Sequence, residues 1–552
     1  MKRKAHKLLS LALALGISAT MLAGCGDAPS SSVPVDISSS GTTSVSDTNA
    51  DPYHVTDEAV TFTFAAAMPT SWGEAKDKQF FQDLEEKTGV HIEWNQFPLE
   101  VANERVGVLM AGSSLPDAFY THNNFSLAQA NTYGQQGLLI DLKPLIEEYA
   151  PNIAKAFDET DGWKAYDAGN GAIYALPKIE VGFPELQTVF TELLINKSLL
   201  EKANVEMPTT TEEFYEVLKA IKGMSTEDGK AIIPFSYGPV YGYGDMLRGA
   251  FGIVDSTCGP SMMDGVYLQY DGNSIDTIAD KDNYKEFIKY MNRLSTEGLM
   301  DQEVYTQDNN MFNAKGQNGQ LASFIDYGGW TVVGQSKIED GTYVAVPVLA
   351  GPDGTKLTQN RYSLIRNACD FAITRDCKDP VTLIKFIDLF YNQDLDVCFE
   401  LYYGPRGINW DYNANGMLEK FPVPENFNSY GEFRASETIP AGPLYIGFDK
   451  QAHYPMSGVD LLKKEMDTTC GYNDAAVYPV LPPLAFTEEE TAELSILRTD
   501  LMDYIKSFEA ACITGQKDVE TEWNNHLAQL EKLGLAQLQE IYSTALERYS
   551  NK

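Results

Sequence analysis

The sequence predicts an α/β protein with two lobes, and three observations support this fold class. Strand-like runs alternate with helical runs along the first part of the chain, which is typical of α/β domains. The same alternation returns near residue 371 after a long intervening region. The length of 552 residues exceeds what one hydrophobic core usually serves, while 43% apolar and 11% aromatic residues are enough to fill two.

The elements of the first lobe follow from local periodicity. An apolar, β-branched run at 59–65 indicates a strand, and a helix over 76–88 follows, ended by Gly89. Alternation at 90–94 predicts a second strand, and a helix is expected over 101–110. Strand, helix and strand in succession are typical of a parallel sheet.

Helix-start signals mark the later elements. Thr209 and Glu212 have the spacing of a capping box, which predicts a helix from there to about residue 222, and another helix is expected over 282–297. A strand is expected at 371–374 and a helix at 380–392, which repeats the strand–helix alternation of the first lobe. Thr487 and Glu490 form a second capping box, followed by apolar residues at helical spacing. The C-terminal region is therefore expected to be helical.

The first sixty residues carry an export signal. A basic start is followed by an apolar stretch at 8–19 that is shorter than the ~20 residues of a membrane span. Leu22-Ala23-Gly24-Cys25 resembles the bacterial lipoprotein pattern, in which the cysteine thiol receives diacylglycerol after cleavage before it. Attachment through Cys25 at the extracellular face of the cytoplasmic membrane is the expectation, with the lipid as the only membrane contact.

The remaining chain divides into a tether and two lobes. Residues after Cys25 are rich in Ser and Thr and contain no aromatic residue before Tyr53, so they cannot build a core. We expect a signal peptide at 1–24, a tether at 25–58, an N-terminal lobe at 59–185 plus about 365–440, and a C-terminal lobe at 186–364 plus about 441–552.

Charge and missing motifs exclude several functions. A formal net charge of −36 disfavours nucleic-acid binding. The sequence has no nucleophile elbow, P-loop or dinucleotide fingerprint, and its scattered histidines lack metal-ligand spacing, so no cofactor and no metal are expected. Apart from Cys25, the cysteines are expected to be mostly free thiols. Glycosidase chemistry stays open, because it needs only two suitably spaced carboxylates.

Several phrases, in their order, resemble the family 1 extracellular solute-binding proteins, specifically the LipO/LplA-like lipoproteins of ABC sugar importers, which are similar to the alginate-binding proteins. The resemblance covers essentially the whole mature chain. It implies the type II periplasmic-binding-protein fold, with ligand in a cleft between two lobes joined by hinge segments, and a separate membrane permease as partner. The phrases are SLPD at 114–117, YALP at 174–177, INK at 195–197, PTTTEEF at 208–214, EGLMD at 297–301, GPDG at 351–354, YGPRG at 403–407, and ITG at 513–515 with ERY at 547–549.

The resemblance is incomplete at one loop. Relatives carry a calcium loop rich in Asp and Asn, whereas this chain has STEDGK at 225–230, with too few oxygen ligands to surround the ion. The family implies a protein that binds an oligosaccharide, is a monomer and is not an enzyme. A peptide or other non-sugar solute, or an anchored glycan-degrading enzyme, are the alternatives.

Sugar sites combine aromatic rings, which stack on apolar sugar faces, with polar side chains that bind hydroxyls. Loops after strands that hold both residue types are therefore the candidates, since such folds bind ligands at strand ends. Arg361 is included among the candidates because an arginine would bind the carboxylate of an acidic ligand. The candidate ligand-binding residues are Trp72, Tyr120, Asn123, Asn124, Tyr241, Tyr243, Asp326, Trp330, Arg361 and Trp410.

Overall fold

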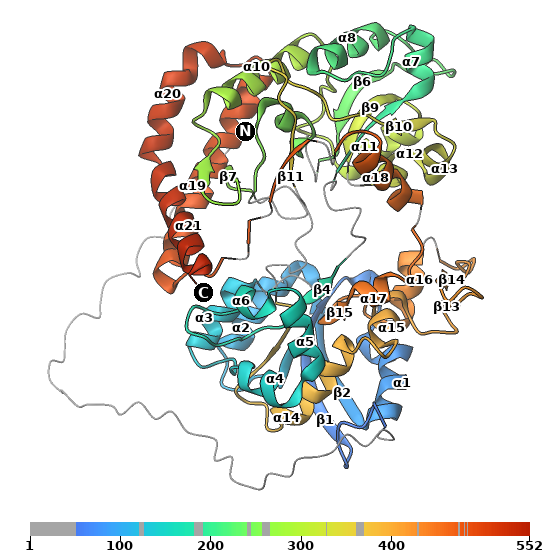
Figure 1. Ribbon diagram of the computed structural model, residues 1–552, viewed down its shortest axis with the longest axis vertical. Coiled ribbons are helices and arrows are strands. Elements are labelled where there is room, and N and C mark those ends of the chain that lie inside the picture. Colours follow the sequence, from blue (N-terminus) through green and yellow to red (C-terminus); the bar gives the residue numbers. More distant parts are fainter. Residues whose placement is uncertain are drawn as a thin grey trace, which may run out of the picture. The chain divides into compact units, whose positions relative to one another are not determined.

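A computed structural model describes most of the chain from residue 51 onward (Figure 1). The described residues are 51–120, 126–181, 191–239, 244–256, 265–326, 328–359, 369–427, 430–456, 458–472, 475–479, 481–482 and 484–551. Within these ranges, none of the helices combines the length and the hydropathy that crossing a membrane requires.

A four-stranded sheet forms the centre of the first lobe, in the order β12-β3-β1-β2. Strands β1 (Val60–Met68), β2 (Val90–Pro98) and β3 (Ala118–Tyr120) are parallel, and β12 (Phe371–Ile373) is antiparallel to β3. Most of β1 is buried, as expected for a parallel strand covered on both faces. The chain therefore returns to this sheet about 250 residues after leaving it.

Helices and two small sheets complete the first lobe. Helix α1 ends where Gly89 adopts a left-handed conformation (φ 72°), and Asp379 caps α14 by accepting a hydrogen bond from the Thr382 amide. The helices are α1 (Gln79–Thr88), α2 (Ala102–Met110), α3 (Leu127–Gln135), α4 (Lys143–Tyr149), α5 (Pro151–Glu159), α6 (Gly162–Ala165), α14 (Pro380–Asp388), α15 (Val397–Tyr403), α16 (Tyr430–Glu437) and α17 (Phe448–Gln451). The small sheets are β4 (Lys178–Glu180) with β15 (Leu444–Ile446), and β13 (Trp410–Tyr412) with β14 (Leu418–Lys420).

A second four-stranded sheet, in the order β10-β5-β9-β6, organises the second lobe. Strand β5 (Glu192–Asn196) is antiparallel to β9 (Leu321–Asp326) and to β10 (Tyr343–Ala345), while β6 (Ile233–Tyr237) is parallel to β9. Because successive side chains point to opposite faces, Leu193 and Ile195 enter one hydrophobic cluster and Leu194 enters another. Both faces of this sheet are thus covered by core.

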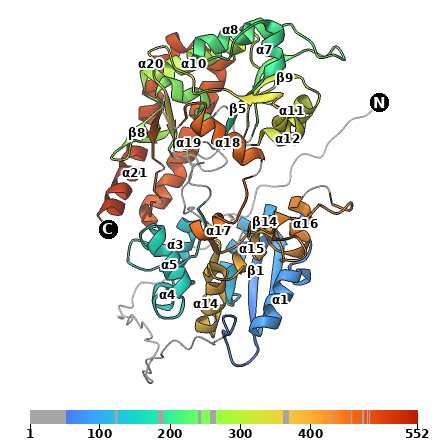
Figure 2. The same ribbon diagram turned by 45° about the vertical axis from the view of Figure 1, so that its right-hand side comes forward.

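The C-terminal helices α19 (Glu488–Ile513) and α20 (Val519–Lys532) pack against α10 (Asp282–Thr296), and α21 (Leu535–Ser550) packs against α19 and α20 (Figures 1 and 2). Thr487 and Glu490 form the predicted capping box of α19. The other helices of this lobe are α7 (Lys197–Ala203), α8 (Thr211–Ile221), α9 (Gly244–Arg248), α11 (Asn309–Gln317), α12 (Gly329–Val333), α13 (Gln335–Glu339) and α18 (Gly458–Thr468), and its small sheets are β7 (Leu268–Tyr270) with β8 (Ile275–Thr277) and β11 (Leu357–Gln359) with β16 (Ala476–Tyr478).

Two sequence expectations need correction. The cap of α8 is Thr210, whose hydroxyl accepts a hydrogen bond from the Glu213 amide, so the expected Thr209–Glu212 pair is shifted by one residue. Residues 444–446 were placed in the C-terminal lobe, but as β15 they pair with β4 and belong to the first hydrophobic core. Residues 444–446 belong to the first lobe because β15 pairs with β4, and sequence periodicity does not reveal the pairing of two such short strands.

Candidate functional site

Ligands of open α/β sheets bind near the carboxyl ends of strands, so the functional residues of each lobe are expected at that end of its sheet. In the first lobe, Trp72 lies in the short 3₁₀ helix η1 (Thr70–Trp72) directly after β1. It is half-buried and packs at the edge of the first core. The position therefore leaves part of an indole ring exposed after the central strand of the sheet.

Lys78 fixes the loop that carries Trp72. Its ammonium donates hydrogen bonds to the carbonyl oxygens of Trp72 and Ala435, the latter at 2.6 Å. Only 2% of Lys78 is exposed, and burial lowers its pKa while the carboxylate of Glu437 opposes that change. The lysine thereby ties the loop after β1 to the last turn of α16.

Arg434, the residue before Ala435, belongs to a group of charged and aromatic side chains. Arg434 donates a hydrogen bond from a terminal guanidinium nitrogen to the Tyr402 carbonyl oxygen (3.0 Å). The Tyr402 ring lies between two cations, with its centroid 4.7 Å from the Arg434 guanidinium carbon and 4.0 Å from Lys178 Nζ. Lys178 also pairs with Glu180 at 3.0 Å. The Tyr402 ring thus connects the Arg434 guanidinium group with Lys178, whose partner is the Glu180 carboxylate.

In the second lobe, the candidate residues lie at the ends of β6 and β9. Asp326 ends β9, opposite Glu192 at the start of β5, and Tyr237 ends the neighbouring β6. Asp326 is only 9% exposed, and a Cβ atom on Gly238 would lie 2.1 Å from its Oδ2. The carboxylate therefore extends over Gly238, at a place where only glycine fits.

Glu192 is fully buried in this group. Its Oε2 accepts a hydrogen bond from the Gly329 amide (3.0 Å), whereas its Oε1 has no hydrogen-bond partner among the described residues. Burial raises the pKa of Glu192 to about 7, with nearby Lys463 lowering it and Asp326 raising it. A carboxyl group with one unsatisfied oxygen at a sheet edge is unusual for structure alone and is typical of functional sites.

Glu192 and Asp326 together hold the turn that carries Trp330. Asp326 accepts a hydrogen bond from the Gly328 amide (3.1 Å), next to the Gly329 amide that donates to Glu192. The Trp330 indole packs on Gly328, where a Cβ atom would lie 2.8 Å from the ring. Trp330 is half-buried and packs at the edge of the third hydrophobic cluster. Two carboxyl groups and one glycine therefore set the orientation of the indole.

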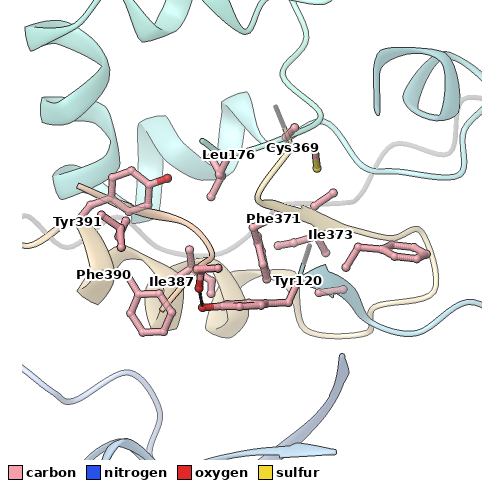
Figure 3. Packing of buried hydrophobic residues seen from close by; sticks show 14 of the residues in the cluster. Tyr120, Leu176, Cys369, Phe371, Ile373, Ile387, Phe390 and Tyr391 are labelled. Carbon is pink, nitrogen blue, oxygen red and sulfur yellow. Dashed lines mark hydrogen bonds between the residues drawn. The ribbon is translucent and has the colours of Figure 1, made fainter. Parts of the chain in front are cut away.

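The structure contradicts two candidates. Tyr120 is 1% exposed, and its hydroxyl donates a hydrogen bond to the Ala441 carbonyl oxygen inside the first core, where Figure 3 shows it among Phe371, Ile387 and Phe390. Trp410 is 0% exposed, and its Nε1 donates to the Gly404 carbonyl oxygen at 2.7 Å. Both aromatic residues are core residues, because their polar atoms find buried backbone partners.

Trp72, Asp326 and Trp330 lie at strand ends as the sequence indicated. Five other candidates fall outside the described residues: Asn123, Asn124, Tyr241, Tyr243 and Arg361, as does the proposed lipidation site Cys25. Glu192 is not among the residues predicted from the sequence, although a charged residue directly before the apolar run LLI is a usable signal.

The described residues contain no group of three or more His, Cys, Asp or Glu side chains suited to a metal ion. At 225–230, the chain makes a tight turn in which Lys230 pairs with Asp228 at 3.0 Å and donates a hydrogen bond to Asn318 at 3.1 Å. The five cysteines that the structure describes, Cys369, Cys377, Cys398, Cys470 and Cys512, are free thiols.

Two α/β lobes with polar and aromatic residues at strand ends define the class of periplasmic-binding-protein-like solute-binding proteins. The family model described as bacterial extracellular solute-binding protein matches residues 69–394, and the chain belongs to this family. Its fold is the two-lobed periplasmic-binding-protein fold.

Individual relatives refine the comparison. The fructooligosaccharide ABC transporter substrate-binding protein FusA of Streptococcus pneumoniae is 29% identical over 98% of this chain and 97% of its own length. The structure of FusA in complex with kestose matches with a TM-score of 0.74 and 27% identity, covering 89% of this chain and all of that one.

Lipoprotein LipO of Bacillus subtilis is 22% identical over 66% of this chain and 70% of its own length. The alginate-binding protein AlgQ2, solved without calcium ion, shares the fold with a TM-score of 0.67 at 20% identity, covering 90% of this chain and 99% of that one.

Proposed function

We propose that this protein is the substrate-binding component of an ABC transporter and that it binds an oligosaccharide, with fructo-oligosaccharides as the first class to test. The observation that carries the proposal is the similarity to FusA, which extends over 98% of this chain and 97% of that protein. The binding of kestose by the FusA structure gives this ligand class its priority.

The sheet edges supply groups that suit a sugar. Trp72 in the first lobe and Trp330 in the second are half-buried residues at strand ends, and an indole is the kind of group that stacks on the apolar side of a sugar. Glu180, Arg434 and Asp326 provide carboxylate and guanidinium groups for hydroxyls. In our proposal the ligand lies between the two lobes, which close around it, and the permease senses that closure.

The remaining parts of the proposal concern location and assembly. Cys25 carries the lipid anchor, residues 25–58 form the tether, and the body acts as a monomer at the extracellular face of the membrane. The lobes comprise residues 59–185 plus about 365–454 and residues 186–364 plus about 455–552. Asn123, Asn124, Tyr241, Tyr243 and Arg361 are the proposed additional ligand contacts.

A thermal-shift screen tests this function. The purified protein is heated with kestose, nystose, other glycan oligosaccharides or peptides, each at about 100 times its dissociation constant, where a ligand adds about 2.7 kcal/mol of stability. Chromatography of the same mixtures detects shorter products. Stabilisation by one glycan class without products is the expected result.

The other outcomes distinguish the alternatives. Stabilisation by peptides alone overturns the oligosaccharide assignment. Release of shorter sugars shows glycan-degrading activity and overturns the proposal that this protein only binds its ligand.

A further inference from the structure

The loop between β1 and α1 carries Trp72 and contains two short turns. These are the 3₁₀ helices η1 (Thr70–Trp72) and η2 (Ala75–Asp77), each three residues long. So short a helix has little stability of its own, because few hydrogen bonds offset the cost of ordering the main chain. The position of Trp72 therefore depends on contacts between this loop and the rest of the first lobe.

Gln96 on β2 holds the main chain between the two turns. Its side-chain oxygen accepts a hydrogen bond from the Ala75 amide (2.8 Å), and its Nε2 donates to the Gly73 carbonyl oxygen (2.9 Å). Gly73 directly follows Trp72 and has a left-handed backbone conformation (φ 75°), which favours glycine. One half-buried glutamine thus fixes the chain immediately after Trp72.

Lys78 connects the same loop to α16. Three carbonyl oxygens accept hydrogen bonds from its ammonium: those of Trp72, Ala435 (2.6 Å) and Ser436 (3.4 Å). An ammonium has three donors, so these carbonyl groups use all of them. Lys78 is almost fully buried, and bulk water therefore does not compete for these bonds. The Trp72 carbonyl is thus tied to a helix that lies more than 350 residues further along the chain.

We propose that Lys78 and Gln96 are positioning residues for ligand binding and that both act through Trp72. The inference rests on the proposed function, in which Trp72 contacts the sugar. The Cα–Cβ direction of a residue follows its main chain, so the hydrogen bonds to the carbonyl groups of Trp72 and Gly73 limit the positions that the indole can take. A loop that is ordered before the ligand arrives loses less conformational entropy on binding, which raises the affinity.

Two substitutions loosen the loop, and isothermal titration with nystose measures the result. K78M keeps an apolar side chain of similar length but leaves the three carbonyl groups without their donor. It is expected to raise Kd about tenfold, equivalent to about 1.4 kcal/mol, and no further than W72A does. Q96L removes both hydrogen bonds of the glutamine and is expected to raise Kd about threefold, because Lys78 still holds the loop. Q96L carries the test if K78M does not fold.

Double variants separate a positioning role from a structural one. If Lys78 and Gln96 act only through Trp72, their replacement has no effect on Kd once the indole is absent. K78M/W72A and Q96L/W72A are therefore expected to bind nystose as W72A does. A side chain that only stabilises the lobe would instead weaken binding by the same factor with and without Trp72.

Q393L is the matched control. Gln393 is also half-buried and also bridges two main-chain groups of the first lobe, donating to the Tyr445 carbonyl oxygen (2.7 Å) and accepting from the Gly447 amide (2.8 Å). Q393L is expected to lower the unfolding temperature as Q96L does and to leave Kd unchanged. Each Kd is measured well below the unfolding temperature of the variant, so that folded proteins are compared.

The outcomes distinguish the two proposals. A wild type that binds neither nystose nor kestose contradicts the proposed function and the inference that rests on it. A wild type that binds nystose, with W72A equal to it, overturns the positioning role alone. Two further results would do the same: K78M and Q96L that lose stability but keep the wild-type Kd, or that weaken binding equally in the W72A background. Equal weakening by Q96L and Q393L would show a general loosening of the lobe and would also overturn it.

Discussion

Replacing Glu192 with glutamine tests the electrostatics of the second-lobe site. Burial raises the pKa of Glu192 from its ordinary 4.5 to about 7. Between these values the folded protein keeps a proton that the unfolded chain has released, so stability falls as the pH rises. At about 1.36 kcal/mol per pH unit, the loss between pH 4.5 and 7 is about 3 kcal/mol.

Glutamine cannot ionise, and E192Q therefore lacks this loss. The side-chain amide group of the glutamine has an NH2 donor in place of the protonated carboxyl oxygen. Its carbonyl oxygen can still accept the hydrogen bond from the Gly329 amide. The free energy of unfolding of E192Q relative to the wild type is expected to rise by up to about 3 kcal/mol from pH 4.5 to pH 8.

Urea unfolding at pH 4.5, 6 and 8, followed by tryptophan fluorescence, measures this difference. E86Q is the control, because Glu86 is exposed and its replacement removes one negative charge at the surface. A difference between E192Q and wild type that is the same at all three pH values would refute the reasoning. So would a difference that E86Q reproduces.

Further substitutions test other parts of the account. Y120F leaves the Ala441 carbonyl without its buried donor, so it should lower the free energy of unfolding by about 1–3 kcal/mol in urea titrations while ligand Kd stays the same; a changed Kd would return Tyr120 to the binding site. W72A and W330A should each raise Kd about tenfold or more in calorimetric titrations, through loss of stacking area, and unchanged affinity would remove either indole from the site. C25S should move the protein from the membrane fraction to the medium on fractionation, and retention in the membrane would contradict lipid anchoring.

The fold was largely predictable because its signals are local. An apolar run located β1, alternation of apolar and polar residues located β2, and the Thr487–Glu490 spacing located the start of α19. The pairing of β15 with β4 was missed, since two three-residue strands leave no periodic pattern and the contact joins residues far apart in sequence.

The site was predictable only in part, for a similar reason. Trp72 and Tyr120 both end or follow strands of one sheet, yet the first is half-buried and the second is sealed in the core. The direction of a side chain at a strand end depends on the elements packed above it, which the local sequence does not specify.

Calorimetric titration of the wild-type protein with nystose tests the central claim most directly. The account predicts saturable binding of one ligand per chain, a negative heat-capacity change from apolar burial, and weaker binding in the W72A and W330A variants. Absence of binding to nystose and kestose, or binding that neither tryptophan affects, would contradict it.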